Sequence, residues 1–335
     1  MTEAEFLDIY NEKDDNALEK LYSKARETAE GVFGKKIYIR GLIEFSNHCK
    51  NDCRYCGIRR SNRNIKRYRL TPEEILSCCD EGYGLGYRTF VLQGGEDPGF
   101  SDQEIEELVI KIKASHPDCA VTLSVGERER DVYKRWFDAG ADRYLLRHET
   151  ADEEHYGSLH PEEMSFRHRI ECLYNLKSIG YQVGCGFMVG SPGQSADTLY
   201  KDLKLIDDLE PHMVGIGPFL PHSDTPYAGE PPGSLRITRI MLALLRISHP
   251  KLLLPATTAL GTLHYDGREK GILSGANVIM PNLSPVRVRK LYSLYDNKIC
   301  TGEESAQCVG CIDKRITAIG YEVVSDRGDH PDMKQ

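Results

Sequence analysis

From about Lys36 onward, short apolar runs rich in β-branched residues alternate with segments in which apolar residues recur every three or four positions. The first pattern predicts buried strands, and the second predicts amphipathic helices. The expected strands cover residues 37–45, 89–93, 120–124, 143–146, 182–189, 213–217, 252–256 and 276–281. Between them, the expected helices include residues 72–79, 102–114, 131–139, 166–179, 195–208 and 235–247.

This repeated alternation favours an α/β fold in which parallel strands close into a TIM-type (βα)8 barrel. A doubly wound open sheet is the alternative. Polar groups directly after the expected strands favour the barrel, because barrel enzymes build their sites at the carboxyl ends of the strands. These groups begin at Gln93, Ser124, Arg147, Met188, Gly217, Thr257 and Pro281.

The same pattern divides the chain into three parts. Residues 1–35 are expected to form an N-terminal helical extension, and residues 36–292 are expected to form the barrel. Residues 293–335 are expected to be a loop-like C-terminal segment that carries further cysteines.

Composition narrows the class of protein. Of the 335 residues, 40% are hydrophobic and 28% are charged, as in soluble proteins that bury a large core. The net charge of −8 argues against nucleic acid or an anionic membrane as a partner. No signal peptide and no run of about 18 apolar residues is evident. We therefore expect a cytoplasmic protein whose 11 cysteines are reduced thiols or metal ligands.

Three cysteines directly follow the first expected strand. Cys49, Cys53 and Cys56 are spaced Cys-x3-Cys-x2-Cys, and thiolates bind soft metals and iron–sulfur clusters. A closed ferredoxin-type site needs four thiolates, so three leave one iron open, as a catalytic metal requires. Two alternatives remain, a structural zinc site with His48 as fourth ligand and three unrelated buried cysteines.

Two further features favour the catalytic cluster. Tyr55 precedes the third cysteine and offers an aromatic face on which a base can stack. Gly94, Gly95 and Glu96 follow the second expected strand, where they offer an accessible backbone edge and a carboxylate that can pair with an amino group.

The cysteine spacing with an aromatic residue before the third cysteine resembles the signature of the radical-SAM superfamily. The resemblance implies that the three cysteines hold a site-differentiated 4Fe–4S cluster, whose open iron chelates S-adenosyl-L-methionine (SAM). Reductive cleavage of SAM would then give methionine and a 5′-deoxyadenosyl radical. Tyr55 would lie near the adenine, and residues 94–96 would contact the methionine amino group.

Over about residues 36–312 the chain resembles the HydE family of FeFe-hydrogenase maturases, near the biotin synthase and methylornithine synthase groups. This implies a role in building the H-cluster, in which the radical attacks the sulfur of an iron–cysteine complex with carbonyl and cyanide ligands. Other maturases, one of which delivers this substrate, and a reductant such as ferredoxin or flavodoxin are the implied partners. The matching stretches are residues 43–47, 66–75, 140–150, 213–219, 255–259 and 275–282.

The resemblance also implies roles for single residues. Glu149 and Arg169 would orient SAM, together with Ser124 and Met188, and Tyr292 would line the catalytic cavity. The alternatives are a surface ion pair for Glu149 and Arg169 and a core position for Met188.

A carboxylate pocket is implied deeper in the barrel. Arg147, Thr257 and Thr258 match its positions, and one guanidinium with two hydroxyls suits a carboxylate. The alternative is that both threonines are ordinary strand residues.

A second cysteine set lies near the C-terminus. Cys300, Cys308 and Cys311 resemble the accessory iron–sulfur site of some HydE proteins, and a zinc site with an outside ligand or a clip for the last helix are the alternatives. The remaining cysteines are expected to be buried apolar groups.

Two other functions compete with the maturase. One is a carbon-skeleton mutase of the methylornithine synthase type, against which the C-terminal cysteines argue. The other is a non-catalytic iron–sulfur carrier, which would need no Glu96, Arg147 or Glu149 at the strand ends.

Overall fold

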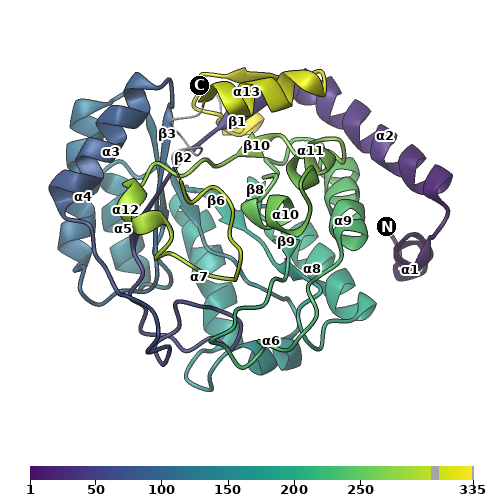
Figure 1. The fold of residues 1–335 in the computed structure, drawn as a ribbon, viewed down its shortest axis with the longest axis horizontal. Helices are drawn as coiled ribbons and strands as arrows, with labels where there is room; N and C mark the ends of the chain where they lie inside the picture. Colours follow the sequence, from purple (N-terminus) through teal and green to yellow (C-terminus); the bar gives the residue numbers. More distant parts are fainter. Residues whose placement is uncertain (303–308, 334–335) are drawn as a thin grey trace.

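A ring of parallel strands surrounded by helices forms the centre of the computed structural model, which describes residues 1–302 and 309–333 (Figure 1). Six strands pair side by side in chain order. They are β2 (Gly41–Ser46), β3 (Thr89–Gly94), β4 (Ala120–Ser124), β5 (Arg143–Leu145), β6 (Gln182–Cys185) and β8 (Met213–Val214).

Further parallel pairs close this ring. β1 (Lys36–Ile39) leads into β2 and pairs with β10 (Val278–Ile279). Single parallel bridges join Met213 to Leu253 and Pro255 to β10. The segment around Leu253 therefore fills the gap between β8 and β10, and the predicted TIM-type barrel is confirmed.

Several predicted strands are shorter than expected or interrupted. The predicted strand 37–45 is divided between β1 and β2, only β10 remains of the predicted strand 276–281, and 252–256 contributes only bridges. The predicted strand 182–189 breaks where Phe187 bridges to Glu149, and the predicted strand 213–217 also splits in two. The pieces split from 182–189 and 213–217 pair with each other near the mouth of the barrel. They are β7 (Met188–Val189) and β9 (Gly217–Pro218).

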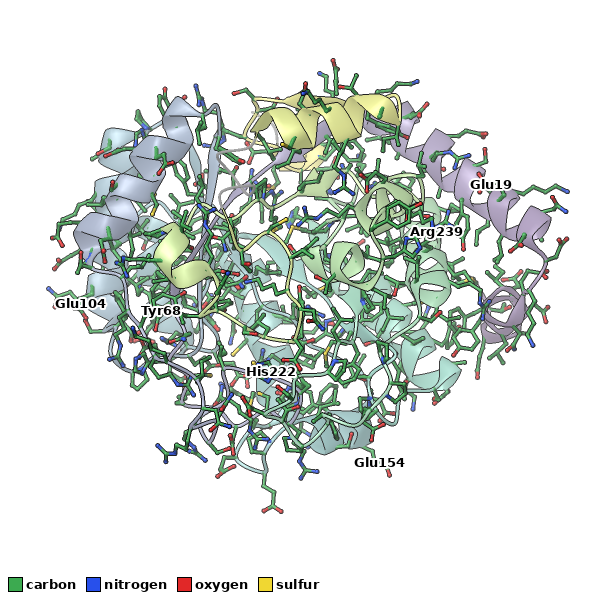
Figure 2. The ribbon with its side chains drawn as sticks, viewed as in Figure 1. Glu19, Tyr68, Glu104, Glu154, His222 and Arg239 are labelled. Atoms are coloured by element: carbon green, nitrogen blue, oxygen red, sulfur yellow. The ribbon has the colours of Figure 1, made fainter. Side chains whose placement is uncertain are left out.

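Local signals place the outer helices where the sequence predicts them. Thr71 and Glu74 form a reciprocal capping box, with Thr71 Oγ1 accepting from Glu74 N at 3.3 Å and Glu74 Oε2 accepting from Thr71 N at 2.9 Å. Glu104 points to solvent, whereas Tyr68 lies inside the molecule (Figure 2). The predicted helices are α3 (Pro72–Gly84), α4 (Asp102–Ser115), α5 (Arg130–Asp138), α7 (Phe166–Ile179), α8 (Ala196–Leu209) and α9 (Leu235–Ser248). Shorter ones are α6 (Glu153–Leu159), α10 (Thr258–Leu263), α11 (Gly267–Ile272) and α12 (Val286–Arg289).

Both ends of the chain pack on the barrel. In the N-terminal extension, α1 (Glu3–Asn11) and α2 (Asp15–Phe33) contact α8 and α9. The C-terminal segment is more ordered than the predicted loop, because β11 (Glu322–Val324) pairs with β1. It also contains α13 (Val309–Ala318) and a 3-10 turn, Pro331–Met333. Within the described part of the chain, every helix is too short or too polar to cross a membrane.

Candidate active site

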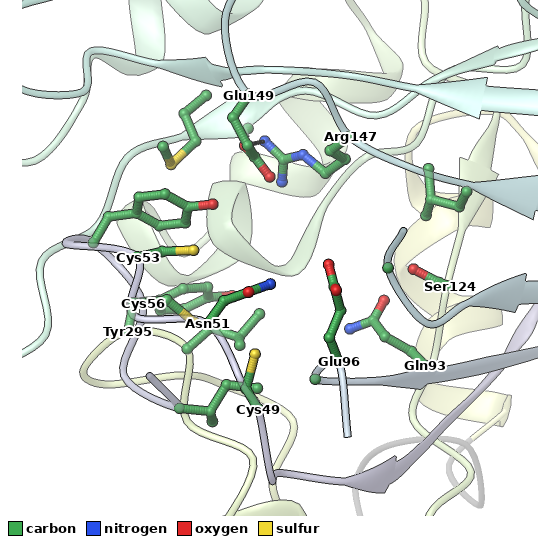
Figure 3. Close-up of a pocket in the computed structure, with 18 of the residues that line it drawn as sticks. Cys49, Asn51, Cys53, Cys56, Gln93, Glu96, Ser124, Arg147, Glu149 and Tyr295 are labelled. Atoms are coloured by element: carbon green, nitrogen blue, oxygen red, sulfur yellow. Dashed lines mark ion pairs between the residues drawn. The ribbon is translucent and has the colours of Figure 1, made fainter. Parts of the chain in front are cut away.

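A cavity of about 290 Å³ opens at the carboxyl ends of the barrel strands (Figure 3). It collects side chains from the loop after β2 and from the ends of β3, β4, β5, β7 and β9, which the barrel brings to one end. The predicted residues that line it are Cys49, Cys53, Tyr55, Cys56, Gly94, Gly95, Glu96, Ser124, Arg147, Glu149, Arg169, Met188, Thr257 and Tyr292.

The loop that carries the three cysteines is held by Arg67, for which no structural role was predicted. The Arg67 guanidinium donates to the carbonyl oxygens of Ile58 at 2.8 Å and of Arg59 at 2.6 Å. It also donates to the carbonyl oxygens of Asn47 and Asn62, on either side of the cysteines. One side chain thus ties together the backbone on both sides of the loop.

The three thiols face the cavity without forming a single-ion site. In residues 1–302 and 309–333, no three His, Cys, Asp or Glu side chains are close enough to share one metal ion. In this structure the three thiols and His48 are not arranged as the four donors, at about 2.0–2.3 Å from one ion, that the zinc alternative requires. A 4Fe–4S cluster distributes its thiolates over separate irons, and the spread of Cys49, Cys53 and Cys56 around one cavity fits that arrangement.

Burial keeps these thiols protonated when no metal is bound. Desolvation raises the pKa of Cys49, raises that of Cys56 to about 12, and raises that of Cys53 well above its usual value. Cluster binding must therefore release protons, since only thiolates bind iron.

Glu96 reaches the cavity because two glycines leave room for its loop. A Cβ on Gly95 would lie 2.2 Å from the His48 carbonyl oxygen, and one on Gly126 would lie 1.9 Å from Glu96 Cγ. Gly126 also has φ of +83°, which favours glycine. Glu96 is 6% exposed and lies 3.1 Å from Lys50 Nζ, but its Oε2 makes no hydrogen bond.

Arg169 lies beside Glu96 and is aligned by a second carboxylate. Its Nε is 2.5 Å from Glu127 Oε1, and its Nη2 is 3.9 Å from Glu96 Oε1. Its Nη1 donates to the Arg147 carbonyl oxygen at 2.9 Å. The sequence did not assign Glu127 a role, because its pairing with Arg169 exists only in the folded barrel.

Glu149 and Arg147 form an ion pair, but several of their buried polar atoms make no hydrogen bond. Their Oε2 and Nη2 atoms are 3.1 Å apart. Neither of these atoms makes a hydrogen bond, and Arg147 Nε and Thr257 Oγ1 are likewise buried without partners. An unsatisfied buried group costs about 1–3 kcal/mol, so this set is suited to a polar ligand.

Glu149 itself has a strained backbone, with φ of +67°. Bonds on both sides hold it: Glu149 N donates to the Gly186 carbonyl at 3.0 Å, and its own carbonyl accepts from Met188 N at 3.2 Å. Its carboxylate is thereby directed into the cavity from the end of β5.

A buried His–Asp pair, absent from the sequence predictions, supports this strained segment. His148 Nε2 lies 3.1 Å from Asp202 Oδ1, and both side chains are 0% exposed. Gly186 N donates to His148 Nδ1 at 3.4 Å, so the ring proton belongs on Nε2. Desolvation lowers the pKa of His148 to about 3, so the imidazole is neutral.

Tyr292 is positioned by a buried ion pair that the sequence also did not reveal. Its hydroxyl accepts from Gln93 Nε2 at 3.3 Å. Lys298 Nζ donates to the Tyr292 carbonyl oxygen at 2.9 Å and lies 2.5 Å from Glu44 Oε1. Glu44 is 2% exposed, so Lys298 supplies its neutralising charge.

Some predicted residues lie outside the cavity. Thr258 is not in its lining, because its hydroxyl accepts from Arg268 Nη2 at 3.0 Å. Arg268 Nη1 also lies 3.4 Å from Cys300 Sγ. Cys308 falls outside the described residues. Cys311 is disulfide-bonded, which differs from the expected thiol, and that bond must be reduced before Cys311 can bind iron.

The barrel and its three-cysteine mouth define a radical-SAM enzyme. The model of the Radical SAM superfamily matches residues 43–206, which begin in β2 and include the cysteine loop. Enzymes of this class hold a 4Fe–4S cluster and SAM, and the cavity fits both. Three thiols face it, and its anionic and cationic side chains, some of whose atoms make no hydrogen bond, match the two charges of a zwitterion.

Known proteins narrow the class further. The chain is 47% identical over 310 residues to the FeFe hydrogenase maturase subunit HydE of Thermotoga maritima, covering 92% of this chain and 88% of that protein. It is 30% identical over 307 residues to 3-methylornithine synthase of Methanosarcina acetivorans, covering 91% and 85%. A crystal structure of methylornithine synthase (PylB) is similar with a TM-score of 0.85 and 27% identity, covering 96% and 94%. The chain belongs to the HydE family.

Replacing Cys53 by Ala should abolish both cluster binding at this loop and reductive cleavage of SAM, because two thiolates do not retain the cluster. The assay is iron content and 5′-deoxyadenosine yield with dithionite, without oxygen. Cys78→Ala is the matched control, since Cys78 is a buried thiol of α3 outside the cavity and should retain both signals. Undiminished 5′-deoxyadenosine yield from Cys53→Ala would refute the assignment of the loop.

Proposed function

We propose that this enzyme acts in the assembly of the H-cluster of FeFe-hydrogenase, on an iron–cysteine complex that bears carbonyl and cyanide ligands. The observation that carries the proposal is that Arg147 and Thr257, which line the same cavity as the three cysteines, each have buried atoms that make no hydrogen bond. The 47% identity to a curated HydE supports the same role.

The chain's own charges would hold SAM at the mouth. Glu96 would accept from the methionine amino group, while Arg169 and Glu149 would contact its other polar groups. Ser124 and Met188 would complete the binding surface, and Tyr55 would lie beside the adenine. When bound, the cluster and SAM would supply a 5′-deoxyadenosyl radical, whose proposed target is the sulfur of the substrate.

The substrate would bind in the same cavity, next to the Arg147 and Thr257 side chains. Arg147 and the Thr257 hydroxyl can pair with a cysteine carboxylate, because Arg147 Nε and Thr257 Oγ1 are buried without a hydrogen-bond partner. Tyr292 lines the same cavity, and its hydroxyl accepts a hydrogen bond from Gln93. Its ring would form one wall of the substrate-binding space.

The two competing functions have weaker support. A methylornithine-synthase-like mutase shares the barrel, but this chain is 30% identical to 3-methylornithine synthase and 47% identical to HydE. A non-catalytic carrier does not account for Glu96, Glu149 and Arg147, whose burial without full pairing costs stability.

We also propose that Cys300, Cys308 and Cys311 bind an accessory iron–sulfur cluster, and that the protein works in the cytoplasm with other maturases. A reductant such as ferredoxin or flavodoxin would supply the electron. The net charge of −8 favours partners that are neither nucleic acid nor an anionic membrane.

Thr257→Val should reduce hydrogenase maturation about 5- to 100-fold, because the lost hydroxyl is worth about 1–3 kcal/mol. Arg147→Ala should reduce it more, at a cost of about 2–5 kcal/mol for an unpaired carboxylate. The measurement is hydrogen evolution after in vitro maturation, scored beside 5′-deoxyadenosine yield.

Thr258→Val is the matched comparison, since this neighbouring hydroxyl points to Arg268 instead of the cavity. It should reduce maturation less than Thr257→Val does. Full maturation by Arg147→Ala would remove the carboxylate site. If the unmodified protein cleaves SAM but supports no maturation with active partners, the mutase becomes the better proposal.

Cys311→Ala should lower the iron content but leave most SAM cleavage intact, because Cys300 and Cys311 do not line the cavity. Iron analysis and 5′-deoxyadenosine yield measure the two effects. Loss of cleavage while the Cys49 loop keeps its cluster would show that the second site is not accessory.

A further inference from the structure

The connection between α6 and α7 contacts three consecutive residues of the cysteine loop. The contacts are Cys53 Sγ to Met164 Sδ at 3.7 Å, Arg54 N to the Leu159 carbonyl oxygen at 2.9 Å, and the Tyr55 hydroxyl to His160 Nε2 at 3.3 Å. Tyr55 also lines the cavity, whereas His160 does not. The contact at Tyr55 is therefore the one that can set the position of an aromatic ring in the cavity from outside it.

The tautomer of His160 makes Tyr55 the donor of this hydrogen bond. His160 Nδ1 lies 2.9 Å from the Tyr156 carbonyl oxygen. A carbonyl oxygen can only accept, so Nδ1 carries the ring proton. Burial lowers the pKa of His160 to about 3, so the ring is neutral and its Nε2 is an acceptor. The single proton of the Tyr55 hydroxyl is thus directed at His160 and cannot be donated to a ligand at the same time.

Packing holds both rings of this pair. His160 is 2% exposed, and its ring stacks on that of Tyr156 with centroids 3.9 Å apart and planes at 24°. The Tyr55 ring meets the same imidazole edge-on, with centroids 5.5 Å apart and planes at 88°. Tyr55 also packs against a buried apolar cluster that includes Met188. The phenol ring is therefore held at its hydroxyl and along its apolar side.

We propose that His160 is a positioning residue for the adenine of SAM and acts through the Tyr55 hydroxyl. The inference rests on the proposed function, in which Tyr55 lies beside the adenine. Because the hydroxyl is held, the phenol ring keeps one orientation, and less conformational entropy is lost when the adenine packs against it. His160 itself touches neither SAM nor the reacting atoms. Its loss therefore weakens SAM binding and leaves the rate of the cleavage step unchanged.

The kinetics of SAM cleavage by the cluster-loaded protein, with dithionite and without oxygen, test this role. His160→Phe, which keeps a ring to stack on Tyr156, and Tyr55→Phe, which removes only a hydroxyl, should each raise KM for SAM about 2- to 10-fold. Both should leave kcat and iron content unchanged. The double variant should be no weaker than either single variant, because both remove the same hydrogen bond. His116→Phe is the matched control, since His116 also stacks on a tyrosine, Tyr83, but lies outside the cavity.

An unchanged KM in both single variants, or single effects that multiply in the double variant, overturns the inference. Loss of iron or a lower kcat in His160→Phe would show that His160 supports the cluster loop as a whole, which also overturns it. Failure of the proposed SAM site has a different result: the unmodified, cluster-loaded protein would then neither bind nor cleave SAM, and the inference would fall with it.

Discussion

The site depends on charged side chains that are buried in the mouth of the barrel and do not have all the hydrogen-bond partners they could bind. Glu96, Arg147 and Glu149 all carry buried atoms without hydrogen bonds. In a folded chain such groups normally find partners, and each omission costs about 1–3 kcal/mol. The surrounding structure must therefore supply the rigidity that keeps these side chains from collapsing onto one another or onto the backbone.

That rigidity comes from residues that do not line the cavity but contact the residues that do. Arg67 fixes the cysteine loop through backbone carbonyls, and Glu127 aligns Arg169. The neutral His148, paired with Asp202, holds the segment whose strained residue is Glu149. Strained backbone and unpaired polar atoms occur together here, as they do in sites where a ligand completes the bonding.

Much of the fold follows from the sequence because parallel strands buried on both faces appear as continuous apolar runs. The order of strands and helices, and the polar groups at the strand ends, could therefore be predicted. The short β11 could not, because the three residues Glu322–Val324 carry no strand pattern and depend on pairing with β1. The strand expected at 252–256 is only a pair of bridges, because hydrogen-bond pairing and not hydrophobicity decides strand length.

The residues of the candidate site also fall into those that could be predicted from the sequence and those that could not. Many of the residues that line the cavity were predictable from their positions after strands and from family resemblance, but Asn51, Met164 and Tyr295 were not. Arg67, Glu127 and Lys298 were not predictable either, because their roles arise from contacts between distant segments, such as Lys298 with Glu44. Thr258 illustrates what the sequence cannot predict for a single residue. Thr257 and Thr258 are neighbours in the chain, and the sequence does not determine which of the two hydroxyls faces the cavity.

The central claim is that these incompletely paired charges bind SAM. Its most direct test is the dissociation constant of SAM for the cluster-loaded protein, compared with Glu96→Gln and with Glu154→Gln on the exposed face of α6. Loss of a charged hydrogen bond should weaken binding by Glu96→Gln about 10- to 100-fold, while Glu154→Gln should bind like the unmodified protein. Unchanged affinity in Glu96→Gln would contradict the account.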